Sequence, residues 1–178
     1  MMHTEVASLP FRKIYAIDFE YCGADGEIPK IVCMVIQDLR SGEVNRYWRE
    51  DLYKMKTPPF ETGEDVALLS YFAPAEVQSM SALNWAADVS IIDLFAEFRC
   101  QTNGNPNVGR KSLISALQFY GLDHLIPEEK DSMRDLILSD GPRSKVQCAA
   151  IFDYCQEDVL ALGPLLNAML KRAPWSEL

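Results

Sequence analysis

Two carboxylates near the start of the chain, Asp18 and Glu20, are the residues whose type and spacing first indicate chemistry. They lie within residues 14–22, an otherwise apolar run that is typical of a β-strand. Side chains alternate across a strand, so the two acids share one face. Neighbouring carboxylates on a partly buried strand repel each other and resist desolvation, so they require a proton or a cation, most simply a divalent metal ion. The alternative is an edge strand whose polar face is solvated.

Three later residues are candidates for the same chemistry. Tyr154 and Asp158 are four residues apart on a predicted helix that begins after Ser144, so they share one face of it. Glu76 lies one turn into another predicted helix, just beyond a strand. Each also has an ordinary explanation: a Tyr and an Asp at this spacing occur by chance on many helices, and an acid is favoured near any helix N-terminus.

The elements that must position these residues follow an α/β order. A three-strand meander comes first, a loop spans residues 51–64, and strands then alternate with helices. Strands are predicted at residues 14–22, 31–36, 44–48, 67–72 and 89–92, with a turn at 23–26. Helices are predicted from Pro74, over 94–99, 113–120 and 127–138, and from Ser144 to 162, after which Gly163-Pro164 should kink or split the helix. In the helix that carries Glu76, the spacing of Val77, Met80 and Leu83 predicts core residues.

Composition limits the class of protein. The chain has 178 residues, 48% of them apolar, and no linker-like stretch, which predicts a single domain over residues 1–178. It has no signal-like start and no apolar run that approaches a membrane span, so we expect a soluble, cytoplasmic protein with no membrane partner. The five cysteines form no C-x-x-C pair, and with only two histidines a zinc site is not expected.

The net charge of −9 argues against nucleic-acid binding through a broad basic surface. It is compatible with a metal-dependent nuclease, because such an enzyme gathers acids around its ions and the ions reverse the local field.

Taken together, these motifs resemble the DEDD superfamily of 3′–5′ exonucleases, and the Tyr-x-x-x-Asp spacing resembles its tyrosine branch. The chain is more closely similar to the exonuclease domain of phage-type and prophage-type family A DNA polymerases, from residue 14 to residue 170. The segments that carry this closer likeness are Leu94-Phe95-Ala96-Glu97-Phe98-Arg99, Thr102-Asn103-Gly104, Met133-Arg134-Asp135-Leu136-Ile137-Leu138 and Asp153-Tyr154-Cys155-Gln156. The resemblance implies a ribonuclease H-like α/β fold, with a central mixed five-stranded sheet flanked by helices.

The resemblance also implies a two-metal mechanism, with two Mg²⁺ or Mn²⁺ ions roughly 3.5–4 Å apart. Asp18 would bridge both ions, and Glu20 and Asp158 would complete the ion that carries the attacking water. Glu76 would hold the second ion, and the Tyr154 hydroxyl would orient the water. The aromatic residues Phe19 and Tyr21, beside the acids, are candidates for stacking on terminal bases, although core packing is the expected role of Phe19.

One position departs from the family pattern, because its second motif usually supplies an Asp. We assign Glu76 to this position from its place after a strand and before Asp93, which resembles a later family Asp that opens a helix. Asp88, in a short loop before a strand, is the rival assignment.

The expected function is hydrolysis of single-stranded DNA 3′ ends to nucleoside monophosphates, as in the proofreading that accompanies DNA replication. The resemblance implies that the chain is an N-terminal part of a larger protein in which a polymerase domain follows Leu178. Two alternatives stay open: an RNA-trimming exonuclease of the same fold, and a domain that has lost catalysis and serves as a binding module. The sequence does not distinguish DNA from RNA as the substrate, and does not indicate an oligomeric state.

Overall fold

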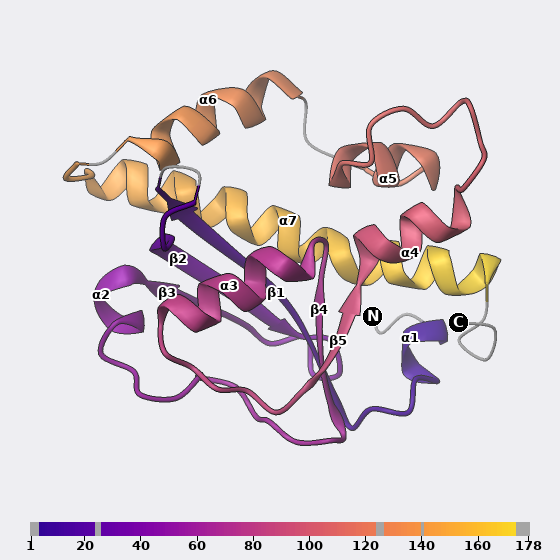
Figure 1. Ribbon diagram of the computed structural model, residues 1–178, viewed down its shortest axis with the longest axis horizontal. Helices are drawn as coiled ribbons and strands as arrows, with labels where there is room; N and C mark the ends of the chain where they lie inside the picture. The colour runs from indigo at the N-terminus through magenta and orange to yellow at the C-terminus, as the bar shows by residue number, and fades with distance from the viewer. Residues whose placement is uncertain (1–3, 24–25, 124–126, 140, 174–178) are drawn as a thin grey trace.

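Five strands form a mixed sheet at the centre of the structure, a computed structural model that describes residues 4–23, 26–123, 127–139 and 141–173 (Figure 1). The strands are β1 (Lys13–Cys22), β2 (Lys30–Asp38), β3 (Val44–Trp48), β4 (Val66–Ser70) and β5 (Ser90–Asp93). Their order across the sheet is β3-β2-β1-β4-β5. The helices are α1 (Thr4–Ala7), α2 (Arg49–Leu52), α3 (Ala73–Ala82), α4 (Leu94–Gln101), α5 (Leu113–Phe119), α6 (Pro127–Leu138) and α7 (Lys145–Arg172). The predicted meander and the alternation that follows it are both confirmed.

Strand directions bring three strand ends to one edge of the sheet. β1 pairs antiparallel with β2 and parallel with β4, and β4 pairs parallel with β5 through partners such as Ser70 and Asp93. The carboxyl ends of β1, β4 and β5 therefore point the same way. Residues that follow β4 and β5 meet there, beside the acidic end of β1.

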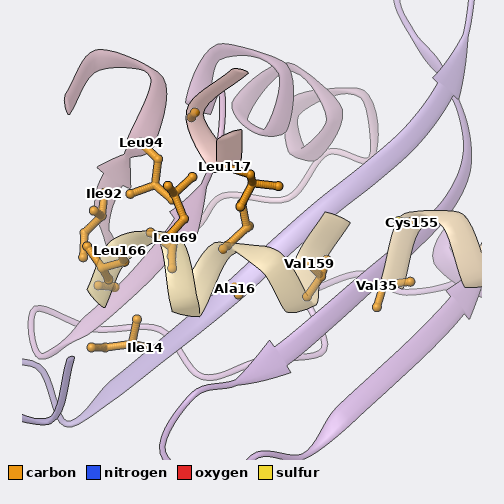
Figure 2. Packing of buried hydrophobic residues seen from close by; sticks show 14 of the residues in the cluster. Ile14, Ala16, Val35, Leu69, Ile92, Leu94, Leu117, Cys155, Val159 and Leu166 are labelled. Carbon is orange, nitrogen blue, oxygen red and sulfur yellow. The ribbon is translucent and has the colours of Figure 1, made fainter. Parts of the chain in front are cut away.

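The alternation along β1 separates two hydrophobic layers. Ile14 and Ala16 pack into a layer with α7, where Figure 2 shows them with Val159 and Leu166. Tyr15, Ile17 and Phe19 face the other layer, which contains Met80 and Leu83 at the C-terminal end of α3. Asp18 and Glu20 thus continue the α7 side of the strand, as the alternation predicts.

Helix α7 begins where the sequence predicts and continues past Leu162 without a break. The Ser144 hydroxyl accepts the backbone N–H of Gln147 at 3.3 Å, and the Gln147 side chain accepts the N–H of Ser144 at 2.9 Å, which completes a capping box. The expected split at Gly163-Pro164 is wrong, since the helix is unbroken from Lys145 to Arg172. Leu162 and Leu165, on either side of the proline, are both buried. Packing against the sheet outweighs the hydrogen bond that Pro164 removes.

Other local expectations need correction. Val77 is 44% exposed, whereas Met80 and Leu83 are buried as predicted. The predicted loop at 51–64 begins with the last residues of α2, and the predicted turn at 23–26 lies partly outside the described residues. None of the helices in the described ranges is both long enough and apolar enough to cross a membrane.

Candidate active site

The acidic end of β1 is the first component of the candidate site. Asp18 and Glu20 are both half-buried and pair with Val35 and Cys33 of β2. The pairing register shifts between Glu20 and Tyr21: they pair with Cys33 and Ile31, so Val32 is an extra residue on β2. An extra residue of this kind interrupts the regular ladder, so the regular pairing of β1 with β2 ends directly after the second acid.

Helix α7 supplies the second component. The buried Cys155 thiol lies 3.3 Å from Oδ2 of Asp18 and 3.5 Å from the Asp18 backbone oxygen, to which it is the donor. The ligand atoms of Asp18, Glu20 and Cys155 all lie within 4.8 Å of one another. This contact joins α7 to β1 at the acids, and the neighbouring Tyr154 lies beside them.

Tyr154 is surrounded by negative charge. Burial raises the pKa of its hydroxyl first, and the carboxylates of Asp158, Glu20 and Asp18 raise it further. The phenol therefore keeps its proton at neutral pH and acts as a hydrogen-bond donor. The structure therefore brings Tyr154 and Asp158 of α7 close to the two acids of β1.

Glu76 is the most unusual residue of the site. It lies in the first turn of α3 and is only 6% exposed. The backbone N–H of Phe19 hydrogen-bonds to its carboxylate, whereas its Oε2 has no hydrogen-bond partner among the described residues. Burial raises the pKa of Glu76 well above its usual range, and the charge of Asp18 adds to this increase. A buried oxygen without a donor, beside a second carboxylate, is a favourable place for a cation.

The rival acid, Asp88, lies elsewhere. Its side chain is exposed, and its backbone oxygen accepts the N–H of Gly63 at 2.7 Å. Gly63 precedes the start of β4, whereas Glu76 follows the end of β4. Asp88 is therefore near the opposite edge of the sheet, and Glu76 is the acid of the two that lies beside Asp18.

Asp93 is a positioning residue whose role the sequence did not reveal. Its Oδ1 accepts the N–H of Ala96 at 3.0 Å, which caps α4, and its Oδ2 accepts the N–H of Ala73 at 3.2 Å, at the start of α3. One carboxylate thus joins the N-termini of two helices. Because α3 carries Glu76, this link helps to hold Glu76 at the site. The sequence signal was an Asp that opens a helix, which indicates the cap but not the second bond.

Of the aromatic residues on β1, only Tyr21 lies open to solvent. Phe19 is 3% exposed and packs against Trp85, with ring centroids 6.4 Å apart, so it belongs to the core. Tyr21 is 37% exposed, and its pKa is raised by burial and by the charges of Glu76, Asp18 and Glu20. It lies at the rim of the acidic cluster.

Comparisons with known proteins identify the fold. No protein-family model and no curated protein matches the sequence. Among solved structures, the chain is similar to the crystal structure of the EXO domain of Nibbler from Aedes aegypti, with a TM-score of 0.56 and 15% sequence identity. The match covers 95% of this chain and 84% of that one. The mixed five-stranded sheet with flanking helices is thus the ribonuclease H-like fold expected from the sequence.

Proposed function

We propose that this chain is a divalent-cation-dependent 3′–5′ exonuclease. The observation that carries the proposal is Glu76, a buried carboxylate with an unpartnered oxygen beside Asp18. A carboxylate in this setting is unfavourable unless a cation binds near it. The likeness of the fold to a domain named EXO supports the proposal, and so does the similarity of the motifs to the DEDD exonucleases.

Four acids would hold the ions: Asp18, Glu20, Glu76 and Asp158. Their oxygen atoms suit Mg²⁺ or Mn²⁺, which prefer hard ligands. Bound there, divalent ions favour phosphodiester hydrolysis by activating water and stabilising the leaving 3′ oxygen. The protonated Tyr154 hydroxyl donates a hydrogen bond to the attacking water and orients it. Because the water is already oriented, the reaction loses less translational and rotational entropy on reaching its transition state.

The experiment uses single-stranded DNA and RNA of one sequence, each labelled at either end. With Mg²⁺ or Mn²⁺, the 3′ label should leave as mononucleotide, while the 5′ label should give a ladder of shortening products. A chelator should stop both. Release of the 5′ label first, or label loss that the chelator leaves unchanged, contradicts the proposal.

Matched variants connect the activity to the site. Glu76→Gln and Asp158→Asn should each abolish most of the turnover. Asp88→Asn and Glu157→Gln are the controls, since both residues are exposed acids close in sequence to the tested ones. If Asp88→Asn were the damaging change, the assignment of Glu76 would be wrong.

We further propose that the substrate is the 3′ end of DNA and that a polymerase domain follows Leu178 in the full-length protein. The sequence resemblance to family A polymerases supports this choice. Faster hydrolysis of RNA than of DNA in the paired assay would favour the RNA-trimming alternative instead.

The vestigial alternative has its own test, the Glu76→Asp variant. A site built around Glu loses its reach when the side chain is shortened, so the variant should be impaired almost as much as Glu76→Ala. A Glu76→Asp variant faster than the parent at saturating Mg²⁺ would favour a degraded site.

A further inference from the structure

An aromatic surface lies at the same sheet edge as the acids. Phe72 follows β4 and is the N-cap residue of α3, and Phe95 lies in the first turn of α4, directly after β5. The backbone N–H of Phe95 donates to the oxygen of Tyr71 at 2.7 Å, which joins the two chain segments. Asp93 binds the N-termini of both helices. The backbone under the two rings is therefore held by three hydrogen bonds.

The rings and one cation form a compact group. Phe72 and Phe95 meet edge to face, with centroids 5.3 Å apart and an interplanar angle of 84°. The Arg99 guanidinium lies 5.6 Å from the Phe95 centroid, within cation–π range. We name Phe72, Phe95 and Arg99 the aromatic platform.

The stability of helix α3 does not explain why a phenylalanine occupies position 72. Its side chain is 46% exposed, so much of the ring stays in contact with water. It also occupies a helix N-cap position and makes no side-chain cap hydrogen bond, where Ser, Thr, Asp or Asn would stabilise the helix. An exposed aromatic ring on a hydrogen-bonded backbone at this position is better explained by contact with a ligand.

The platform lies close to the proposed reaction site. Phe72 precedes Glu76 by four residues, which is about one helical turn. The Glu76 carboxylate in turn reaches the Phe19 backbone and the Asp18 charge. The platform is therefore within reach of the last few nucleotides of a strand whose 3′ end lies among the acids.

We propose that the aromatic platform binds a base of single-stranded nucleic acid by stacking, with Arg99 contacting the adjacent phosphate. This inference rests on the proposed function, because it takes the acidic site as the place where the strand ends. Every nucleobase has a π face, so stacking holds a strand without reading its sequence. A protein of net charge −9 needs such a contact, since it has few cations to spare for the phosphates.

The binding experiment uses the Asp18→Asn background, to prevent hydrolysis, and single-stranded DNA with 2-aminopurine near its 3′ end. Binding should quench the fluorescence of the stacked base. Phe72→Ala should weaken binding by about 5- to 100-fold and remove the quenching, and Phe72→Trp should restore both. Val146→Ala is the matched control. Val146 is 79% exposed and lies in the first turn of α7, so this substitution should leave binding unchanged.

An abasic substrate tests the mechanism of the contact. When the bases near the 3′ end are absent, the parent should bind as weakly as Phe72→Ala does, so the two proteins should become equal. If Phe72→Ala weakened binding of the abasic strand as much as it weakened binding of the normal strand, stacking would be refuted. Unchanged affinity of Phe72→Ala for the normal strand would also overturn it, and would favour a protein surface as the occupant.

The outcomes separate this inference from the proposed function. Hydrolysis that is metal-dependent but has the same KM in Phe72→Ala would refute the platform alone. Quenching that depends on Phe72 in a protein that never hydrolyses DNA or RNA would refute the exonuclease and leave the platform as a binding site.

Discussion

Replacing Asp93 tests whether one carboxylate holds two helices in place. Asp93→Ala removes both acceptors, so the N–H groups of Ala96 and Ala73 lose their partners. Asp93→Asn keeps one side-chain oxygen but replaces the other with an NH₂ group, which cannot accept. Asp93→Asn can therefore keep one of the two bonds, whereas Asp93→Ala keeps neither.

The magnitude follows from the two bonds. Loss of the α4 cap costs about 1 kcal/mol. Ala73 is a buried residue, so its N–H, if left without an acceptor, costs about 1–3 kcal/mol more. Removing Asp93 also relieves its repulsion of Glu76 and Glu97, whose pKa values it helps to raise. We expect Asp93→Ala to lower the free energy of unfolding by about 2–4 kcal/mol, which is a fall in Tm of about 4–16 °C, and Asp93→Asn by about half as much.

The assay is urea unfolding of each variant with and without Mn²⁺, together with the Mn²⁺ concentration that gives half-maximal nuclease activity. Since α3 carries Glu76, Asp93→Ala should raise that concentration as well as lower stability. Asp88→Ala, an exposed acid five residues earlier, is the control. Stability within 0.5 kcal/mol of the parent, on the order expected for an ordinary surface substitution, would refute the double cap.

Three further predictions concern the site itself. Tyr154→Phe should lower turnover by about 10- to 1,000-fold, or roughly 1.4–4 kcal/mol of barrier, with little change in stability; an unchanged rate would show that the hydroxyl only packs. Without metal, stability should fall as the pH rises from the usual Glu range through the raised pKa of Glu76, because the folded state binds the extra proton. In urea unfolding, Glu76→Gln should abolish this dependence of stability on pH. If the dependence persists in Glu76→Gln, another titrating group causes it. Cys155→Ala should raise the half-maximal Mn²⁺ concentration about two- to tenfold by removing the donor to Asp18, and Cys155→Ser should largely restore it. Equal values for the two variants would mean that packing alone matters.

Much of the fold follows from patterns that act over short distances. Alternation along residues 14–22 correctly assigned Ile14 and Asp18 to one face, because a strand has a strict period of two. The Ser144 cap was predicted because a capping box is a local motif. The continuity of α7 through Pro164 was not, because it depends on burial against a sheet assembled from distant residues.

In the candidate site, too, local spacing was predictable from the sequence, whereas contacts between distant elements were not. Spacing indicated that Tyr154 and Asp158 share a helix face, but it did not show that Cys155, one residue later, would contact Asp18 across 137 residues of sequence. The second bond of Asp93 was missed for the same reason, since the N–H that it binds belongs to another helix. Contacts between elements depend on how the elements pack, and no short motif encodes that.

The placement of the acids links folding to function. β1, the first turn of α3 and the middle of α7 each contribute a carboxylate or a hydroxyl, and each element is anchored by an apolar layer that excludes water. Packing of the two apolar layers holds Glu76 close to Asp18 although their charges repel. The free energy of this packing offsets an arrangement of charges that is unfavourable without a cation. A ligand that binds only the folded state stabilises it. Divalent ions bound at these carboxylates, as proposed, should therefore raise the stability of the domain, and increasingly so at higher pH, where Glu76 would otherwise carry an uncompensated charge.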